Sequence, residues 1–591
     1  MPTSVPSGAP SAPGKHRRAL VAGFLAVATL GAVSACDNAD AANTAPEPAK
    51  GGTLRVNIQG GIDLLDPQRT YAALDMNVLR LTTRTLTTYA STQADASAIV
   101  PDLATDTGRP SENNTVWKFT LKPGVKWEGG EPVTCSQVKH GIERRFSPLM
   151  DEGAPYPKDY LQDNAKPYEG PWLDGNNDGK GLESIRCLDE RNIQFTLRRP
   201  VGDFGYALAL TTFAPVLPEK DNQLDYANRP YSNGPYKIES RSEDELVLVR
   251  NNFWNETNDQ VRKAYPDKIV MDFRQDEAGA LTNELIENQG EARNTIMIDS
   301  NVAPNFLQQV ANDPELIKRT VSGPTGGVRW MAINMRRIPE LKCRQALIYA
   351  FNKRKWRTVA GGSVIGDYAT TIIPEGFKAH KDFDIYDSLA NTEGNPEKTE
   401  QLMNEQAAAG QPCKSKIRIG FRDLPVNKRP INTVVEAYQA AGIEVDAVAV
   451  PSQGYYTTGI GDPNNDYDMV LVGWIPDWAN GSAILPPLFA SSNIPAPDPL
   501  TGKASGNVNW SLLESPEIDQ QMDLALAETS PDRQWALWGD IDEQLARLAT
   551  TIPILYEKAF RLSGSNIAGG FVHPAFGMPD LAALGLVDPS L

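Results

Sequence analysis

Strand-like and helix-like segments alternate through the second half of the chain, and this alternation restricts its fold more than any other feature. An apolar run at 328–335 precedes a helical pattern at Leu341–Asn352. A second helical pattern, Asn432–Ala441, leads into the strand-like Ile443–Val450, and Ile552–Tyr556 is the last strand-like run. Such alternation is typical of βαβ units. We therefore expect a mixed α/β fold.

The first half has antiparallel signals as well. Thr53–Ile58 and Val116–Leu121 have strand patterns, and Tyr236–Ser240 with Leu246–Arg250 predicts a hairpin. Thr134 is placed to cap a helix whose apolar residues recur four apart. Because 591 residues exceed what one hydrophobic core supports, we expect two or three domains.

The N-terminus has the features of an export signal. Basic residues at 15–18 precede the apolar stretch Ala19–Ala32, which is too short for a confident membrane span. The following "VSAC" resembles the lipobox of bacterial lipoproteins, although an ordinary secretory peptide before a cysteine is the alternative. We predict a lipoprotein signal peptide at residues 1–35 and lipidation of Cys36.

Residues 36–51 have no apolar periodicity, and they predict a flexible tether between the lipid and the folded part. Two acyl chains at Cys36 would anchor the protein stably. The expected location is therefore extracytoplasmic, at the outer face of the cytoplasmic membrane. The formal net charge of -17 argues against nucleic acid as a partner and weakly favours cationic or zwitterionic ligands.

Four cysteines follow the tether: Cys135, Cys187, Cys343 and Cys413. An even number in an exported protein suggests disulfides, and four cysteines allow three pairings. We favour Cys135–Cys187 and Cys343–Cys413, because each closes a loop within one expected domain; four free thiols are the alternative. The cysteines lack the CxxC or HxxxH spacing typical of zinc sites, so we predict no metal site.

Six stretches in a fixed order carry a family resemblance. They are "GGIDLLDPQRTY", "TVWKFTLKPGVKWEGGEPVTCSQVKHGI", "YSNGPYKI" with "LVLVRNNFW", "WMAINM" with "CRQALIYAFNKRK", "YDMVLVGWIPDW" and "TIPILYEKAF". In this order they resemble the family 5 solute-binding proteins of bacterial ABC importers, which include dipeptide-, oligopeptide- and nickel-binding proteins.

The resemblance implies a two-lobed periplasmic-binding-protein-like fold of the large cluster C type, with a hinge that the chain crosses twice. Lobe I would comprise residues 52–324, with an extra subdomain at about 93–215, and would be completed by residues 550–591. Lobe II would comprise residues 325–549. Ligand would bind between the lobes, which would close over it. We expect a monomer without cofactors.

The segment Trp474-Ile475-Pro476-Asp477 matches the Trp-x-x-Asp segment whose aspartate holds the ligand's ammonium in peptide-binding members. The sequence places no Lys or Arg near Asp477, and a buried unpaired charge is costly, so its partner could come from outside. The alternative is that Asp477 caps a helix beginning at Ala479.

Five further residues are ligand-site candidates. Trp474 and Trp478 could line the pocket, with a place in the lobe II core as the alternative. The resemblance implies that Leu65, Asp66 and Tyr71 approach the ligand from lobe I.

Other functional motifs are incomplete. The run "DGNNDGKGLESI" at 174–185 begins like a calcium loop but has Ile185 where the last ligand should be Glu, so a polar turn is the first interpretation and calcium the alternative. The sequence contains no HExxH or GxSxG motif, so we expect no enzyme, with a secreted peptide hydrolase as the alternative class.

We therefore predict a substrate-binding lipoprotein that captures short peptides between its lobes and delivers them to the permease of an ABC importer. A nickel chelate or another amine-bearing solute is the alternative ligand. Only four His are present, which argues against nickel held by imidazole.

Overall fold

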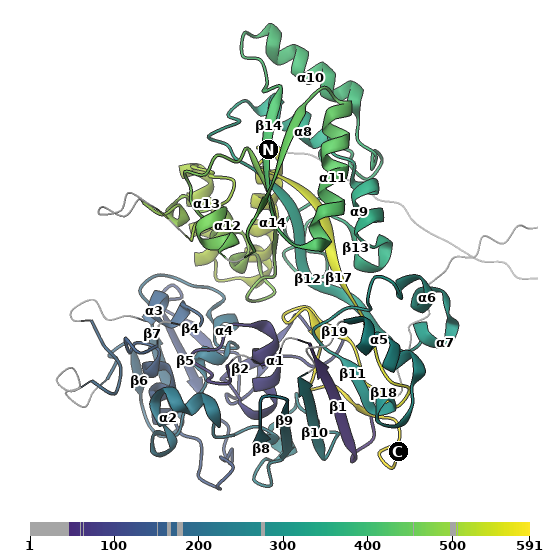
Figure 1. Ribbon diagram of the computed structural model, residues 1–591. Helices are drawn as coiled ribbons and strands as arrows, with labels where there is room; N and C mark the ends of the chain where they lie inside the picture. The colour runs from purple at the N-terminus through teal and green to yellow at the C-terminus, as the bar shows by residue number, and fades with distance from the viewer. Residues whose placement is uncertain are drawn as a thin grey trace, which may run out of the picture. The chain divides into compact units, whose positions relative to one another are not determined.

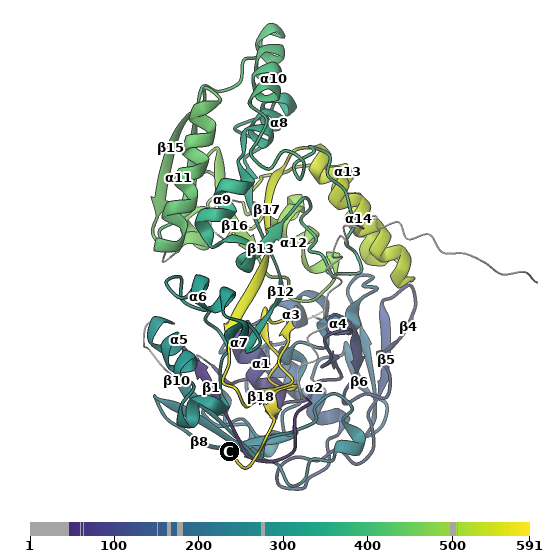
Figure 2. The ribbon, with the colours of Figure 1, turned by 90° about the vertical axis from the view of Figure 1, so that its right-hand side faces the viewer.

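The computed structural model describes residues 47–591 except 60, 63, 151, 162–166, 174–180, 274–277, 453, 497–503 and 505. Residues 45–591 form one compact α/β unit with two lobes built on different sheets (Figures 1 and 2). The predicted signal peptide, Cys36, most of the tether and most of the calcium-like run lie outside the described residues. No helix in the described part of the chain has the length and apolar composition needed to cross a membrane.

The first lobe contains a five-stranded sheet in the order β11-β1-β10-β9-β8. Strand β1 (Thr53–Ile58) lies between β10 (Lys268–Phe273) and β11 (Thr295–Met297), parallel to both. The expected hairpin is present as β8 (Tyr236–Arg241) and β9 (Glu245–Arg250). Leu54, Val56 and Ile58 of β1 are completely buried in the core of this lobe.

A separate four-stranded antiparallel sheet, β4-β5-β7-β6, lies in the region expected to form the extra subdomain. Its strands are β4 (Arg109–Ser111), β5 (Val116–Thr120), β6 (Ile185–Cys187) and β7 (Asn192–Thr196). Aromatic side chains pack at its centre: the Phe119 and Phe195 rings meet edge to face at 5.9 Å. This contact fixes one face of the sheet inside the core.

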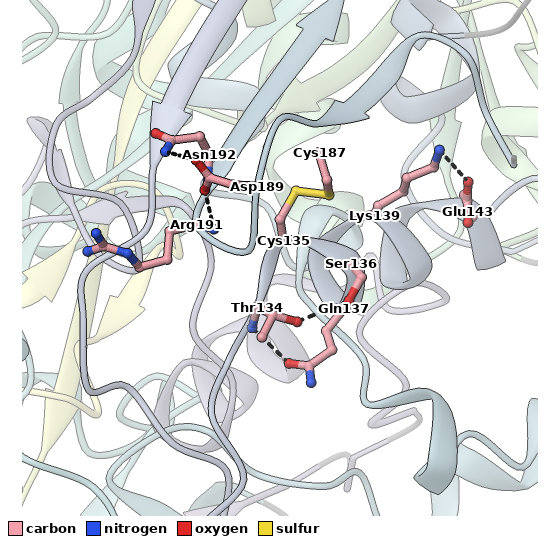
Figure 3. The surroundings of a disulfide bond; sticks show 10 residues. All are labelled: Thr134, Cys135, Ser136, Gln137, Lys139, Glu143, Cys187, Asp189, Arg191 and Asn192. Atoms are coloured by element: carbon pink, nitrogen blue, oxygen red, sulfur yellow. Dashed lines mark hydrogen bonds and ion pairs between the residues drawn. A yellow bond between two sulfur atoms is a disulfide. The ribbon is translucent and has the colours of Figure 1, made fainter.

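A disulfide joins this sheet to helix α2 (Cys135–Arg144), as Figure 3 shows. It links Cys135 at the start of the helix to Cys187 at the end of β6. The helix begins where expected, because Gln137 Oε1 accepts a hydrogen bond from the Thr134 backbone N–H at 3.0 Å, part of a capping box. The second disulfide joins Cys343 to Cys413. The pairing is the one favoured from sequence, and each bond closes a loop of 52 or 70 residues.

The second lobe is built on a six-stranded sheet, β13-β17-β12-β16-β14-β15. Its strands are β12 (Thr320–Ile333), β13 (Gly366–Tyr368), β14 (Lys416–Arg422), β15 (Glu444–Val450), β16 (Met469–Trp474) and β17 (Thr551–Leu562). Strands β14 and β15 are parallel, and helix α11 (Pro425–Ala440) connects them as a βαβ unit. Trp330 and Met331, adjacent on β12, are buried in different core clusters, so both faces of the sheet are covered.

The remaining elements surround these sheets. The other helices of four or more residues with α geometry are α1 (Ala73–Thr82), α3 (Tyr156–Leu161), α4 (Phe204–Ala207), α5 (Ala278–Glu287), α6 (Leu307–Asn312), α7 (Pro314–Ile317), α8 (Leu341–Ala350), α9 (Lys353–Ala360), α10 (Pro396–Ala408), α12 (Leu485–Phe489), α13 (Pro516–Ala527) and α14 (Pro531–Arg547). Short strand pairs are β2 (Thr87–Tyr89) with β3 (Ile99–Pro101), β18 (Ile567–Ala568) with β21 (Gly585–Leu586), and β19 (Val572–His573) with β20 (Met578–Pro579).

Strands β12 and β17 form a ribbon that connects the lobes (Figure 1). They pair from Thr320 opposite Leu562 to Ala332 opposite Thr551, with a register shift between Pro324 and Val328. At one end Ser563 bridges to Ile296 in the first-lobe sheet, and at the other end β12 pairs with β16. The chain therefore passes between the lobes twice, in two adjacent strands. The lobe boundaries at 324 and 549 stay predictions.

The end of the chain completes the first lobe. Asp580 Oδ1 lies 2.8 Å from Arg80 Nη1 in a fully buried ion pair, and Asn77 Nδ2 donates to the Pro579 carbonyl at 2.9 Å. Near the other terminus, the Ala49 N–H donates to the Leu586 carbonyl, and the Gly51 N–H donates to the Tyr265 carbonyl, each at 2.8 Å. Residues 49–51, which we expected in the tether, are thus attached to the folded unit.

A buried carboxylate on α14 predicts a pH effect on stability. Asp542 accepts hydrogen bonds from the backbone N–H groups of Ile372 and Ile373, and its burial raises its pKa to about 6. An acid whose pKa is raised on folding stabilises the fold while protonated, and this contribution is lost as the pH rises through the folded pKa. We expect the unfolding free energy of wild type, relative to that of Asp542→Asn, to fall by about 2 kcal/mol between pH 4 and pH 7.

Urea unfolding of both proteins at several pH values measures this difference. Asp540→Asn is the matched control, because Asp540 lies on the same helix but is exposed and paired with Lys381. A constant difference between wild type and Asp542→Asn across this range would contradict the prediction.

Candidate ligand site

The Asp477 carboxylate lies where the two lobes meet. Strand β16 ends at Trp474, and three residues later the Asp477 side chain is partly buried against first-lobe tyrosines. The Tyr71 hydroxyl donates to Asp477 Oδ2 at 2.9 Å, and the Tyr156 hydroxyl donates to the same oxygen. Of the five further candidates, the structure therefore brings Tyr71 into direct contact with Asp477.

No cation neutralises this carboxylate within the described residues. Its hydrogen-bond partners are the two neutral hydroxyls, and no Lys, Arg or His of the described chain lies within ion-pair distance. Burial raises the pKa of Asp477, and the two tyrosine hydrogen bonds partly oppose that shift. The alternative role as a helix cap is wrong, because the next helical turn is Gly481–Ala483, whose cap is the Asn480 side chain.

The two tryptophans have different surroundings. Trp478 is buried in the first-lobe core, and its ring centroid lies 4.7 Å from that of Tyr156. Trp474 packs against the second-lobe core instead, and its indole N–H donates to the Ala483 carbonyl at 2.9 Å. Trp478 thus shields the Asp477–Tyr156 contact from one side. Trp474 packs against the second-lobe core, which was the alternative to a role in lining the pocket.

The side chains of Leu65 and Asp66 are buried and contact other residues of the first lobe. Leu65 is buried in the core, and Asp66 is completely buried in an ion pair with Arg144, at 3.0 and 2.7 Å from its two terminal nitrogens. The Asp66 carboxylate is therefore already compensated. A ligand contact by either residue stays a prediction.

A second buried carboxylate, Asp203, connects the lobes next to Trp478. Asp203 precedes α4 in the first lobe, and its Oδ2 accepts from Trp478 Nε1 at 3.2 Å, from Asn480 Nδ2 at 3.0 Å and from the Ser482 hydroxyl. We call these four residues the Asp203 cluster. Burial raises the pKa of Asp203, and the three donors oppose the shift. All three donors follow β16 in sequence, so the cluster ties the second lobe to the first.

The cavity beside Asp477 is small, about 20 Å³. Its lining includes Asp477, Tyr89, Arg80 and Arg262. Both guanidiniums are already paired, Arg80 with Asp580 and Arg262 with Asp102 at 2.8 Å each. This volume is near that of a single water, so a larger solute requires the lobes to separate.

The chain matches a known protein family over more than half of its length. The family model described as "Bacterial extracellular solute-binding proteins, family 5 Middle" matches residues 98–496. This chain is a family 5 extracellular solute-binding protein. Members of this family bind solutes for transport and are not enzymes, as expected from the sequence.

Solved structures and curated relatives are similar over most of their length. The clavulanic acid biosynthesis oligopeptide binding protein 2 is 28% identical with a TM-score of 0.84, covering 92% of this chain and 97% of that one. The unliganded open form of the murein tripeptide binding protein MppA has a TM-score of 0.72 at 18% identity, covering 92% and 98%, and supports the fold alone. The glutathione-binding protein GsiB of Salmonella paratyphi A is 20% identical over 79% of this chain and 82% of its own length.

The sequence of this solute-binding protein did not predict Tyr156, nor three members of the Asp203 cluster, Asp203, Asn480 and Ser482; the fourth, Trp478, was a candidate. All four missed residues belong to the interlobe contact, but none of them lies in a recognised motif. The signal that could have revealed Asp203 is a single acid within the otherwise apolar segment "VGDFGYAL". Tyr156 and Asp477 are 321 positions apart, so sequence spacing does not predict their contact.

The Tyr156 hydrogen bond predicts a coupling that can be measured. We expect Tyr156→Phe to lower the free energy of unfolding by about 1–3 kcal/mol, because it leaves a buried carboxylate with one donor fewer. In an Asp477→Asn background the cost should fall to about half, since hydrogen bonds to a charged acceptor are roughly twice as strong. Urea unfolding of the four proteins measures the coupling. Tyr160→Phe is the control, and equal costs in both backgrounds would argue against a charged acceptor.

Proposed function

We propose that this solute-binding protein captures short peptides between its lobes and that Asp477 binds the ligand's terminal ammonium. The observation that carries the proposal is a partly buried carboxylate at the lobe interface that has two tyrosine donors and no cation among the described residues. An ammonium in this place would form a charge-assisted hydrogen bond and supply the missing positive charge. Oligopeptide, murein tripeptide and glutathione occur in the names of similar proteins.

Binding would proceed by opening and closing of the lobes about the β12–β17 ribbon. Opening separates Asp477 from Tyr71 and Tyr156 and admits the peptide. The ammonium then takes the place of the tyrosine hydrogens or joins them around the carboxylate. Closing buries the pair beside Trp478, which keeps water away and strengthens the interaction. The closed protein, anchored through Cys36, would deliver the peptide to the permease of an ABC importer.

Native mass spectrometry of the purified protein, followed by calorimetry with trialanine and N-acetyl-trialanine, tests the proposal. We expect a co-purified peptide mass, or binding of trialanine at least tenfold tighter than of its acetylated form, since acetylation removes the ammonium. Equal affinity for both forms would contradict the role of Asp477. Tight binding of an amine without peptide bonds, and of no peptide, would favour the alternative of another amine-bearing solute.

In the described ranges, no three His, Cys, Asp or Glu side chains are grouped as a metal site. The geometry therefore gives no support to nickel held directly by side chains, and a nickel chelate stays the alternative ligand.

A further inference from the structure

A second pocket between the lobes lies beside Asp203 and is separate from the small cavity at Asp477. Its volume is about 470 Å³, within the range of small-molecule sites, and the two share no lining residue. We call it the α14 pocket, because it lies where α14 of the second lobe approaches α4 and β4 of the first (Figure 2). Its lining includes Trp117, Asp203 and Tyr206 of the first lobe with Gln534 and Trp535 of the second.

Two buried polar groups in the wall of the α14 pocket have atoms without partners in the described chain. Asp203 Oδ1 accepts no hydrogen bond, although Oδ2 accepts three, and Gln534 Nε2 donates none. The two residues are only 7% and 3% exposed, and a buried polar atom that lacks a partner carries an uncompensated desolvation cost. One unused acceptor and one unused donor therefore belong to residues that line the same pocket.

The orientation of the Gln534 amide follows from its neighbours. Asn480 Oδ1 accepts from the Gly481 backbone N–H at 2.8 Å, so the donor of the Asn480 amide is the other terminal atom, Nδ2. That nitrogen donates to Gln534 Oε1 at 2.9 Å and to Asp203 Oδ2 at 3.0 Å. The two headgroups thus lie on either side of one nitrogen, and the atoms left unused are Asp203 Oδ1 and Gln534 Nε2.

Aromatic side chains supply much of the apolar lining. Trp117 lies on β5, Tyr206 on α4 and Trp535 on α14, and rings of this kind favour a flat aromatic group in contact with them. Two other charged residues line the pocket, Lys378 and Asp95. Both are exposed and have opposite charges, so their effects on a charged ligand oppose each other.

A primary carboxamide carried by an aromatic ring has the groups that this lining lacks. Its NH₂ would donate to Asp203 Oδ1, its carbonyl would accept from Gln534 Nε2, and its ring would contact the indoles. An ammonium would satisfy only the acceptor. A carboxylate would satisfy only the donor and would face the Asp203 carboxylate. The lining therefore favours an uncharged amide over either ion.

Contacts across the lobes close the walls of the α14 pocket. The Gly202 N–H donates to the Leu526 carbonyl at 2.8 Å, and the Ser97 hydroxyl donates to the Gly376 carbonyl at 3.4 Å. A ligand that enters while the lobes are apart would be enclosed when these contacts form. Because it would contact both lobes, its binding would favour the closed form.

We propose that the α14 pocket is a second binding site, for a small aromatic carboxamide, and that its occupation increases the affinity for peptide. Asp203 and Gln534 recognise the amide, and the aromatic residues contact the ring. The coupling arises because both ligands favour the closed form. The site itself does not depend on the proposed function, because Asp477 does not line this pocket.

NMR titration of the purified protein with benzamide, benzylammonium and benzoate, by saturation transfer at pH 7, tests the ligand class. We expect saturable binding of benzamide and at least about fivefold weaker binding of either ion, because each ion leaves one buried atom unpaired. Equal or tighter binding of benzylammonium or benzoate would overturn the assignment of an amide. If benzamide shows no saturable binding, the site is overturned.

Two variants test the location of the site. Ala98→Trp fills the pocket from an exposed position of its lining, and we expect it to weaken benzamide binding at least about tenfold. Ala407→Trp, at an exposed position of α10, is the matched control and should bind benzamide as wild type does. Equal benzamide affinity in wild type and Ala98→Trp would overturn the assignment to this pocket.

Gln534→Met tests the donor, because it keeps the length of the side chain and removes the amide. We expect at least about fivefold weaker binding of benzamide, and an unchanged affinity would overturn the role of Gln534. The comparison of wild type with Ala98→Trp changes no buried residue, so it stands even if Gln534→Met fails to fold.

Calorimetry with trialanine, with and without saturating benzamide, tests the coupling. We expect benzamide to increase the affinity for trialanine at least about twofold. Displacement of benzamide by trialanine would overturn a separate site, and an unchanged trialanine affinity would overturn the coupling. If trialanine does not bind at all, the proposed function is contradicted, while the benzamide titrations of wild type and Ala98→Trp still decide whether the second site exists.

Discussion

Asp477→Asn is expected to weaken peptide binding by about two to three orders of magnitude. Removing one partner of a buried ion pair costs about 3–5 kcal/mol, and about 1.4 kcal/mol corresponds to a factor of ten in affinity. The substitution keeps the size of the side chain and removes its charge. Titration calorimetry with trialanine measures the change.

The empty protein should respond differently to the same substitution. Because Asp477 is partly buried and has no cationic partner among the described residues, removal of its negative charge should leave the melting temperature of the unliganded protein unchanged or raise it slightly. Asp523→Asn, at an exposed position of α13, is the control. Equal affinity in wild type and Asp477→Asn would remove Asp477 from the site, and a parallel fall in melting temperature would indicate a structural role instead.

Asp203→Ala should favour separated lobes and weaken binding at least about tenfold. It removes an acceptor shared by three donors of the other lobe, and each hydrogen bond to a charged group contributes about 1.5–3 kcal/mol. Small-angle scattering should show a larger radius of gyration for the unliganded variant, and calorimetry should show the weaker binding.

Asp203→Asn is the matched control, because an amide oxygen can still accept from Trp478 and Ser482. Since no described cation pairs with Asp203, we expect this variant to remain close to wild type in both measurements. If Asp203→Ala has the radius of gyration and affinity of wild type, the Asp203 cluster does not hold the lobes together.

Local patterns predicted the local structure of this chain. Strand β1 has the bounds expected from its alternation, and both disulfides have the favoured pairing. Differences arise at Pro and Gly. Helix α11 starts at Pro425 and includes Pro430, whereas the expected helix began at Asn432. Proline fits the first turn of a helix, where its missing N–H is not needed, but Pro430 inside the pattern hid the start.

The length of strand β12 was underestimated for a related reason. The strand starts at Thr320, whereas the expected strand started at 328. Pro324 and the glycines around it are typical of turns, so the sequence pattern did not indicate a strand before 328. Pairing with β17 on both sides of the register shift between Pro324 and Val328 overrides this local preference. Tertiary pairing of this kind is not contained in the pattern of one strand.

Only some residues of the candidate site were predicted from the sequence. The Trp-x-x-Asp segment identified Asp477, and Tyr71 was identified by resemblance. Tyr156 and Asp203 were missed, because their importance comes from partners elsewhere in the fold: Asp203 and Ser482 are 279 positions apart. A missing counter-ion becomes visible only after all neighbouring groups have been placed.

The pairing of Arg80 with Asp580 has a consequence for how the protein reaches its native state. A chain that emerges from its N-terminus presents Arg80 first and Asp580 almost last, with the whole second lobe between them. The first core therefore lacks the carboxylate that compensates Arg80 on burial until synthesis or translocation is nearly finished. A C-terminal truncation that removes only the last dozen residues should thus leave a product that aggregates or is degraded, even though it retains every residue around Asp477.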